Sequence, residues 1–322
     1  MMRAVVLSHC CKAEELQVSH LERPEPRPGW AVVRVRAAGL NHSEVVLRTV
    51  EADFDYIHTP VVPGIECVGE VFATAAGSKL RVGQRVMALM GGMGRSFDGS
   101  YAEYALLPET HVFPTCSRLD WLRLAAVPET YYTAYGSLFG SLLLQPGDVL
   151  LVRGATSTVG RAALQLAKAA GARVVAACRR DEAFPELRRL GADSCVVDDG
   201  KLADRSFPER PNKVLELIGP KTLQDSLRVV SAPGYVCCTG VLGKVYHVSQ
   251  FDPIKYLPNG VFLSSFYSNT PTQEALDAMM TLMERGGIEP QYSRVFKLEE
   301  IAQAHALLEQ GGAGGKIILD LC

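Results

Sequence analysis

The sequence predicts an α/β protein that consists of a mainly β part followed by a doubly wound sheet. Residues 1 to about 120 contain short β-like runs separated by Gly- and Pro-rich turns, with few helical periods between them. After about residue 120, nearly continuous apolar runs alternate with helix-length segments. Such alternation is typical of a parallel sheet that is covered on both faces.

The β-like runs of the first part suggest a mostly antiparallel domain. They occupy residues 3–8, 31–38, 66–73, 84–90 and 101–107. The turn "RPEPRPGW" between the first two runs is rich in proline, which cannot continue a central strand. We therefore expect a compact β domain in this half of the chain.

The apolar runs of the second part predict strands at 148–153, 173–177, 194–198, 213–218, 234–239 and 261–266. This number fits a doubly wound nucleotide-binding sheet. The segment after the first of these strands places Val159, Ala163, Leu166 and Ala170 on one helical face. The tail, 268–322, predicts a helix, a second helix, a glycine turn and a final strand.

Length and composition limit the possible functions. The 322 residues are enough for two domains, and the net charge of −2 argues against nucleic acid or a membrane surface as the main partner. The nine cysteines form no Cys-x-x-Cys pair, which predicts reduced thiols and a cytoplasmic location. The N-terminal run resembles a strand more than a signal peptide, and no apolar stretch approaches the roughly 18 residues of a membrane span.

The strongest functional signal is a strand, turn, helix and strand over 148–177. A turn of small residues at a helix N-terminus lets backbone N–H groups approach a pyrophosphate. Ala155, Ser157 and Gly160 occupy the glycine positions of the Gly-x-Gly-x-x-Gly pattern, so two of the three glycines are replaced. An ordinary strand-to-helix turn is the alternative. The residues predicted to bind cofactor here are Ala155, Thr156, Ser157, Thr158, Val159 and Gly160.

The end of the second strand of this unit indicates which cofactor is bound. An acidic residue there would accept hydrogen bonds from the adenosine ribose and favour NAD. The chain instead has Cys178, Arg179 and Arg180, with no acid before Asp181. Because arginine engages phosphate through a planar fork, we predict NADP(H), bound at its 2′-phosphate by Arg179 and Arg180. The alternative is that both arginines cap the next helix or face solvent.

Six motifs in order resemble the zinc-independent, quinone oxidoreductase-like branch of the medium-chain dehydrogenases/reductases. They are "AGLNHSE" (38–44), "VVPGIECVGEV" (61–71), "GSYAEYALLP" (99–108), "VPETYYTAYGSL" (127–138), "RGATSTVGRAALQLAKAAGA" (153–172) and "GGKIIL" near the end. The resemblance implies a GroES-like, mainly β catalytic domain (1–120), a doubly wound Rossmann NADP-binding domain (121–267) and a C-terminal segment (268–322) that completes the catalytic domain. It also implies a homodimer formed by pairing of the last Rossmann strand, around 261–266.

The resemblance also bears on metal. In zinc-dependent relatives the catalytic metal takes ligands at positions that correspond here to Asn41, Ile65 and Glu129. These three side chains do not make a zinc site, because asparagine is a poor ligand and isoleucine is none. No cysteine lies between residues 68 and 115, so the structural zinc lobe of such relatives is missing as well. Glu66 is predicted to be a buried structural carboxylate that accepts a backbone hydrogen bond.

Without a Lewis acid, substrates that accept hydride readily remain, namely quinones and α,β-unsaturated carbonyl compounds. Asn41 is a candidate amide donor to the nicotinamide ribose or to a substrate oxygen. His42 is a candidate cofactor contact or proton relay, or else a surface residue, and Tyr56 is a phenolic donor or a packing residue. The resemblance places Thr133 near the carboxamide side of the nicotinamide. Gly240 follows a predicted strand, and its backbone is expected beside the nicotinamide.

The predicted activity is therefore NADPH-dependent reduction of a quinone or an activated alkene, with a small-molecule substrate as partner. Two other enzymes stay open: an enoyl-thioester reductase and a specialised biosynthetic reductase. An NADPH-binding sensor or structural protein without turnover is the non-enzyme alternative. Fold does not fix function, so the sequence leaves the individual substrate open.

Overall fold

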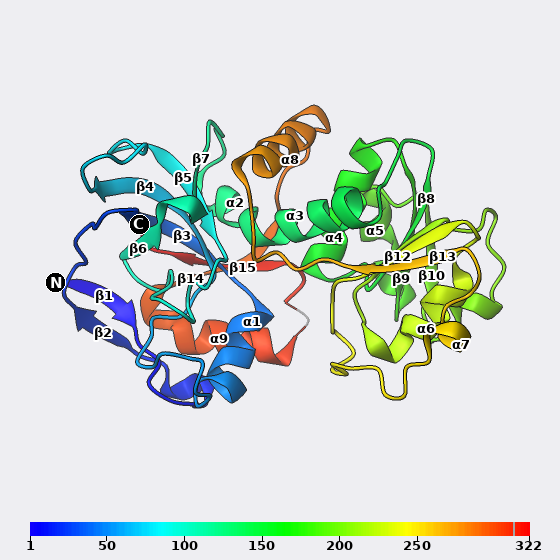
Figure 1. The fold of residues 1–322 in the computed structure, drawn as a ribbon, viewed down its shortest axis with the longest axis horizontal. Coiled ribbons are helices and arrows are strands. Elements are labelled where there is room, and N and C mark those ends of the chain that lie inside the picture. The colour runs from blue at the N-terminus through cyan, green and yellow to red at the C-terminus, as the bar shows by residue number, and fades with distance from the viewer. Residues whose placement is uncertain (312) are drawn as a thin grey trace. The chain divides into compact units, whose positions relative to one another are not determined.

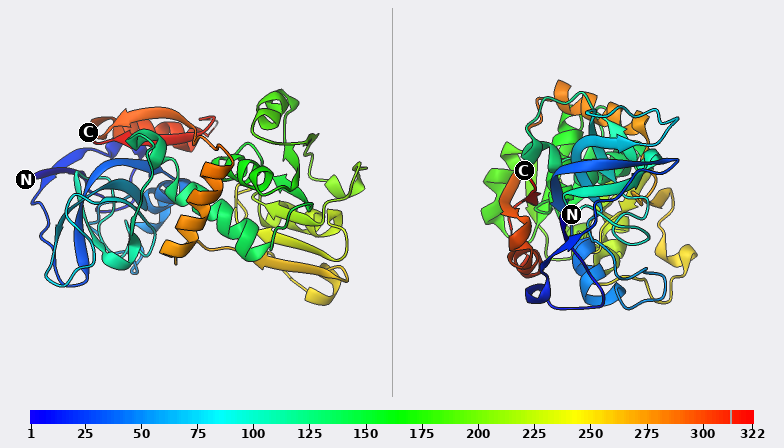
Figure 2. Two further views of the ribbon diagram at one scale, coloured as in Figure 1. Left: turned by 90° about the horizontal axis from the view of Figure 1, so that it is seen from above. Right: turned by 90° about the vertical axis from the view of Figure 1, so that its left-hand side faces the viewer.

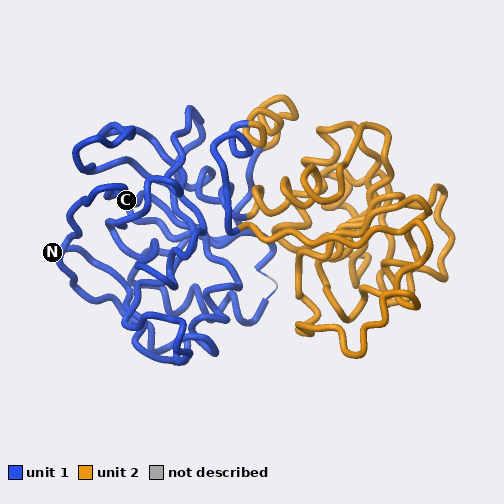
Figure 3. The backbone as a smooth tube through the Cα atoms, in the orientation of Figure 1, with its two compact units in different colours: residues 1–129, 269–277, 289–322 blue, residues 130–268, 278–288 orange. Residues whose placement is uncertain are grey.

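The computed structural model describes residues 1–311 and 313–322, which divide into two compact units (Figure 3). Unit 1 comprises residues 1–129, 269–277 and 289–322. Unit 2 comprises residues 130–268 and 278–288. The tail is therefore shared: residues 278–288 group with unit 2, and residues 269–277 and 289–322 group with unit 1.

Unit 1 is built on a seven-stranded, mostly antiparallel sheet (Figure 1). Its strand order is β14-β15-β3-β4-β5-β7, and β6 also pairs with β3. The single parallel pair of this sheet is β14 with β15. The bounds are β3 Trp30–Leu40, β4 Glu66–Thr74, β5 Arg85–Leu89, β6 Tyr104–Pro108, β7 Val112–Pro114, β14 Tyr292–Lys297 and β15 Lys316–Asp320. A separate hairpin-like pair joins β1 (Met2–Val5) and β2 (Val18–Leu21).

The helices of this half are α1 (His42–Val46), α2 (Trp121–Ala125) and α9 (Ile301–Gln310). Helix α9 packs against β14 and β15 (Figure 2). The core of unit 1 gathers apolar side chains from both ends of the chain, for example Val33, Leu107 and Ile317. The C-terminal strand β15, which pairs with β3, is therefore an integral part of unit 1.

Unit 2 contains a six-stranded parallel sheet with the order β10-β9-β8-β11-β12-β13. Counted from β8, this is the 3-2-1-4-5-6 order of the doubly wound dinucleotide-binding fold. The strands are β8 Val149–Arg153, β9 Arg173–Cys178, β10 Ser194–Val197, β11 Lys213–Glu216, β12 Gly234–Cys238 and β13 Val261–Ser265. The prediction of an α/β protein with a GroES-like and a Rossmann domain is confirmed.

The helices that cover this sheet are α4 (Thr158–Ala169), α5 (Phe184–Arg189), α6 (Pro220–Val229) and α7 (Pro253–Tyr256). Helices α4 and α6 lie on opposite sides of the sheet (Figure 1). Because both faces are covered, β8 is buried along its whole length and reads as an apolar run up to Arg153. Two further helices, α3 (Pro128–Tyr135) and α8 (Gln273–Arg285), include two of the points where the chain passes from one unit to the other.

Two general features concern the cysteines and the length of the helices. All nine cysteines lie within the described part and are free thiols. Among the described residues, no helix combines the length and the apolar character needed to cross a bilayer.

A buried polar chain attaches α9 to the rest of unit 1. His305 is 1% exposed, and its Nδ1 accepts a hydrogen bond from Arg48 Nε at 3.2 Å. Since an arginine only donates, the imidazole proton must sit on Nε2, which faces the Tyr101 hydroxyl at 3.2 Å. Arg48 also donates to the Cys11 carbonyl at 2.5 Å and pairs with Glu309. Burial, with the nearby Arg48 charge, lowers the pKa of His305 to about 3.

This shift makes the stability of unit 1 depend on pH. An unfolded histidine titrates near pH 6.5, so between roughly pH 6.5 and 3 the unfolded chain binds one more proton than the native one. Stability from His305 is complete above pH 6.5 and falls by about 1.4 kcal/mol per pH unit below it. His305→Gln keeps an acceptor and a donor but cannot titrate. We expect the free energy of unfolding, measured with urea, to fall more between pH 6 and pH 5 for the native chain than for this variant.

Unfolding of unit 1 can be followed by fluorescence, because the two tryptophans, Trp30 and Trp121, both lie in unit 1. Tryptophan fluorescence therefore follows the unfolding that the His305 network controls. If the free energy of unfolding depended on pH in the same way for the native chain and for His305→Gln, this assignment would be contradicted.

Candidate functional site

The turn between β8 and α4 has the geometry that close approach of a phosphate requires. Gly154 has a φ of +86°, a conformation that favours glycine. A Cβ atom on Gly160 would lie 2.6 Å from the Gly154 carbonyl oxygen and 2.8 Å from Ala155 Cα. Only glycine therefore lets the first turn of α4 pack onto the loop. The first amides of α4 point out of the helix end, where a phosphate group is stabilised.

The small polar residues of this turn have different roles. The Ser157 hydroxyl donates to the Gly154 carbonyl at 2.9 Å and accepts from the Gly160 amide at 3.1 Å, so it caps α4. Its hydroxyl is thus engaged within the turn on both its donor and its acceptor side. The hydroxyls of Thr156 and Thr158 make no hydrogen bond with any residue that the structure describes. Ala155 is buried, and Val159 is half-buried.

The two arginines after β9 are exposed. Neither Arg179 nor Arg180 forms an ion pair within the described part of the chain. The next residues, Asp181–Ala183, form a short 3-10 turn before α5. The guanidinium groups are therefore available to an anionic ligand, and they also face solvent, as the alternative interpretation stated.

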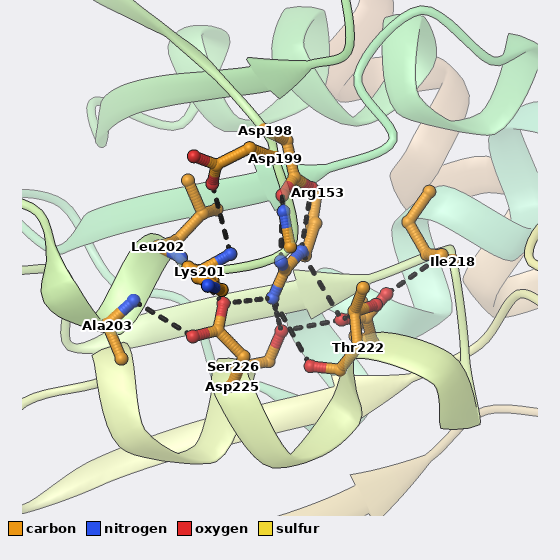
Figure 4. A network of polar contacts seen from close by, with 12 residues as sticks. Arg153, Asp198, Asp199, Lys201, Leu202, Ala203, Ile218, Thr222, Asp225 and Ser226 are labelled. Atoms are coloured by element: carbon orange, nitrogen blue, oxygen red, sulfur yellow. Dashed lines mark hydrogen bonds and ion pairs between the residues drawn. The ribbon is translucent and has the colours of Figure 1, made fainter.

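A buried charge cluster, whose members are not among the predicted site residues, begins at Arg153 directly before the turn (Figure 4). Arg153, the last residue of β8, is completely buried and forms a two-point ion pair with Asp198 at 2.7 and 2.8 Å. Glu216, at the end of β11, accepts from the Ser226 and Thr222 hydroxyls and from two backbone amides. Desolvation by burial raises the pKa of Glu216. The cluster fixes the ends of β8 and β11, where the strand order of the sheet reverses.

Two further predicted contacts also lie in unit 2. Thr133 is 9% exposed in α3, and its carbonyl accepts from the Ser137 hydroxyl at 2.7 Å. That hydroxyl is 2.8 Å from the Thr239 hydroxyl, so α3 is tied to the loop after β12. Gly240 follows in this loop, and a Cβ there would lie 2.3 Å from the Leu217 carbonyl oxygen. The loop after β12 therefore runs tightly against the end of β11.

In unit 1, Asn41 belongs to a buried polar cluster at the end of β3. Lys316 Nζ lies 2.5 Å from Glu66 Oε1 and donates to Asn41 Oδ1 at 2.6 Å. Asn41 Nδ2 donates to Glu66 Oε1 at 2.8 Å and approaches the Gly39 carbonyl oxygen at 3.4 Å. Lys316 is 2% exposed and Glu66 is 0% exposed. The amide of Asn41 is thus oriented by an ammonium on one side and a carboxylate on the other.

Glu66 and Glu44 are both fully buried, and their environments differ. Glu66 accepts a hydrogen bond from the Glu129 backbone amide at 2.8 Å, which confirms the predicted structural carboxylate. Glu44 accepts from the backbone amides of Asn41 at 2.8 Å and Ile65 at 3.1 Å. Burial raises the pKa of Glu44 to about 7. Glu44 therefore changes its charge close to neutral pH, next to the loop that carries Asn41.

The three positions that correspond to zinc ligands in relatives are thus used in other ways. The Asn41 side chain is held by Glu66 and Lys316. Ile65 is buried, and Glu129 offers its backbone amide to Glu66. Within the part of the chain that the structure describes, no group of three or more His, Cys, Asp or Glu side chains is arranged to hold a metal ion.

The other two candidate catalytic residues lie on the outside of unit 1. His42 is the first residue of α1 and is exposed. Tyr56 is 60% exposed, and its ring leans on Phe54 at 5.6 Å between centroids. Both side chains are thus exposed, whereas those of Glu66 and Lys316 are buried.

The cluster explains why residue 39 is glycine. A Cβ on Gly39 would lie 2.5 Å from both Glu66 Oε1 and Lys316 Cε. We expect Gly39→Ala to force the ion pair apart and to lower the free energy of unfolding by about 1–3 kcal/mol. Urea unfolding measures this loss. Gly140→Ala is the matched control, since no atom lies within 4 Å of an added Cβ there. An equal loss of free energy of unfolding in the two variants would contradict the claim.

Comparison with known proteins agrees with this architecture. The family model described as "Alcohol dehydrogenase GroES-like domain" matches residues 27–117, and the one described as "Zinc-binding dehydrogenase" matches residues 190–319. The quinone oxidoreductase of Sus scrofa is 28% identical over 92% of this chain and 90% of its own length. An alcohol dehydrogenase of Geobacillus stearothermophilus is 28% identical over 99% of each chain. The crystal structure titled "NAD-dependent alcohol dehydrogenase" covers 99% of both chains with a TM-score of 0.87 and 28% identity.

These likenesses define an oxidoreductase with a GroES-like domain and a Rossmann-like cofactor domain. The chain belongs to the medium-chain dehydrogenase/reductase family, in its quinone oxidoreductase branch. Dehydrogenases of this family use nicotinamide cofactors.

Proposed function

We propose that this chain is an NADPH-dependent reductase of quinones or of α,β-unsaturated carbonyl compounds, and that it works without zinc. The observation that carries the proposal is the cluster of Asn41, Glu66 and Lys316. The positive charge in this cluster is an ammonium, and the neighbouring side chains are an amide and an ion-paired carboxylate. Such groups are a poor zinc site, so the chemistry relies on substrates that accept hydride readily.

The residues of unit 2 fit a dinucleotide. The glycine-dependent turn and the N-terminus of α4 suit the pyrophosphate, and the exposed pair Arg179 and Arg180 suits a 2′-phosphate. The hydroxyls of Thr156 and Thr158 are further donors to phosphate. When bound, the nicotinamide supplies the hydride. Thr133 and the backbone of Gly240 are proposed to flank it.

The residues of unit 1 supply donors to the substrate side of the reaction. In the reduction of an enone, hydride adds to the β-carbon, the negative charge moves to the carbonyl oxygen, and a proton is taken up at the α-carbon. The second N–H of Asn41, now near the Gly39 carbonyl oxygen at 3.4 Å, is the proposed donor to that oxygen or to the cofactor ribose. His42 and Tyr56 are exposed groups that can relay or donate the proton.

A homodimer is part of the proposal. Strand β13 is the edge strand of the parallel sheet and, among the described residues, pairs only with β12. Phe262 on this edge is 53% exposed and stacks on Tyr235 at 4.9 Å. An open edge with exposed aromatic surface favours pairing with a second copy. A cytoplasmic location and the absence of nucleic-acid or membrane partners stay predictions.

Oxidation of NADPH at 340 nm by the full chain tests the proposal. A quinone, an enone, an enoyl thioester and a simple ketone are offered in parallel. We expect turnover with the quinone or the enone. The rate with the ketone should be at least about 100-fold lower, because the proposed site has no metal ion to polarise its carbonyl group. Preference for the thioester would point to an enoyl-thioester reductase. Binding without turnover would favour a sensor, and no binding of any nicotinamide cofactor would overturn the proposal.

A further inference from the structure

Arg153 is the most buried cation of unit 2 and stands at the end of the central strand β8. Its side chain is 0% exposed and meets three carboxylates that come from different elements. These are Asp198 after β10 and Asp225 in α6, both labelled in Figure 4, and Glu216 at the end of β11. The residues before it in β8 are buried and apolar, so Arg153 is the single charged residue of this strand.

Asp198 lies beside the point where the chain leaves β9. Val197 is in register with Cys178, and the Asp198 amide donates to the Cys178 carbonyl oxygen at 2.8 Å. The next residue after Cys178 is Arg179. Asp198 therefore brings a carboxylate, from the segment that follows β10, close to the end of β9. A free carboxylate there would repel a 2′-phosphate and would accept hydrogen bonds from ribose hydroxyls.

This carboxylate is held away from any ligand. Arg153 Nε donates to Asp198 Oδ2 at 2.7 Å, and Nη2 donates to Oδ1 at 2.8 Å. The Gly200 amide also donates to Oδ1 at 2.9 Å. The Asp198 side chain is only 7% exposed. A two-point ion pair of this kind fixes both charge and direction.

Arg153 is itself fixed on its other side. Its Nη1 donates to the Ser226 hydroxyl at 3.0 Å and the Thr222 carbonyl oxygen at 3.2 Å, and it lies 2.8 Å from Asp225 Oδ2. Asp225 in turn accepts the amides of Leu202 and Ala203, in the loop after β10. The guanidinium therefore connects this loop to α6.

The remaining charges nearby divide into paired and unpaired groups. Asp199 pairs with Arg205 at 2.8 Å, so the second carboxylate after β10 also has a counter-ion. Arg179 and Arg180 are exposed and have no ion-pair partner among the described residues. Asp181 and Glu182, which follow them, are exposed as well.

We propose that Arg153 is a positioning residue for cofactor selection: it withdraws Asp198 into a buried ion pair, so that a 2′-phosphate meets Arg179 and Arg180 without that competing carboxylate. This inference rests on the proposed preference for NADPH. Loss of the Arg153 charge leaves Asp198 without its counter-ion beside β9. The freed carboxylate repels a 2′-phosphate and accepts hydrogen bonds from ribose hydroxyls, which shifts selection toward NADH.

The test is a double-mutant cycle on the full chain. The dissociation constants of NADPH and NADH are measured by fluorescence titration for the native protein, Arg153→Gln, Asp198→Asn and the double variant. We expect Arg153→Gln to reduce the preference for NADPH at least about 10-fold, while Asp198→Asn changes it less than about 3-fold. The double variant should regain the native preference for NADPH, because it lacks the Asp198 carboxylate that repels the 2′-phosphate.

The outcomes separate this inference from the proposed function. A native protein that binds NADPH no more tightly than NADH overturns both. A native preference for NADPH that Arg153→Gln leaves unchanged, or that the double variant fails to regain, overturns the role of Arg153 alone. Where Arg153→Gln does not fold, Arg153→Lys decides. It keeps the charge but not the two-point contact, and we expect a loss of preference of about 3- to 10-fold that Asp198→Asn reverses.

Discussion

Replacing Lys316 with methionine is expected to lower the free energy of unfolding of unit 1 by about 3–5 kcal/mol. The variant removes the ammonium that lies 2.5 Å from Glu66 and leaves a carboxylate buried without a counter-ion. Asn41 loses the donor that holds its Oδ1 at the same time. Methionine fills a similar volume, so the loss is electrostatic more than steric. Urea unfolding followed by tryptophan fluorescence measures it, because Trp30 and Trp121 both belong to unit 1.

The double variant Lys316→Met with Glu66→Gln is the control. It removes both charges and keeps an acceptor for the Glu129 amide, which now bonds to Glu66 at 2.8 Å. Because a buried pair is often worth little against neutral groups of similar shape, we expect most of the lost stability to return. Equal destabilisation of the single and double variants would show that the cluster is not an ion pair in the sense described above.

The second large effect concerns the cofactor. Arg179→Gln with Arg180→Gln is expected to raise the dissociation constant of NADPH by about 100-fold, while that of NADH changes by less than about 3-fold. A hydrogen bond to a charged group contributes roughly 1.5–3 kcal/mol, and both arginines are exposed without an ion-pair partner in the described structure. Fluorescence titration with each cofactor gives the two constants directly.

Arg228→Gln is the matched control for this variant. Arg228 is an exposed arginine in the last turn of α6, so its replacement changes the charge of the same unit at a different place. We expect it to leave both constants unchanged. An equal loss of affinity for NADPH and NADH in the double variant would contradict the assignment of the 2′-phosphate to Arg179 and Arg180.

Most of the fold could be predicted from the sequence because each strand has a local sequence pattern that identifies it. The runs that became β8 to β13 are short, apolar and bounded by turns, so their order and number define the doubly wound sheet. The glycine-poor turn was still recognisable from its position between β8 and α4. Gly160 remains the one residue there whose replacement by any side chain would collide with the loop.

The charged clusters could not be predicted, because their members are far apart in the sequence. Lys316 stands within the quoted run "GGKIIL", but only the pairing of β15 with β3 brings it to Asn41 and Glu66. Arg153 ends an otherwise apolar strand, and that mismatch was the only local signal. Whether such a residue faces solvent, a ligand or a buried carboxylate depends on tertiary packing. The same dependence explains why the Ser157 hydroxyl caps a helix instead of pointing outward.

Zinc content and reductase activity, measured on one sample before and after treatment with a chelator, test the central claim most directly. We expect less than about 0.1 zinc per chain and an undiminished rate of NADPH oxidation by a quinone or an enone after chelation. Stoichiometric zinc, with activity that is lost on chelation and regained when zinc is added back, would contradict the account.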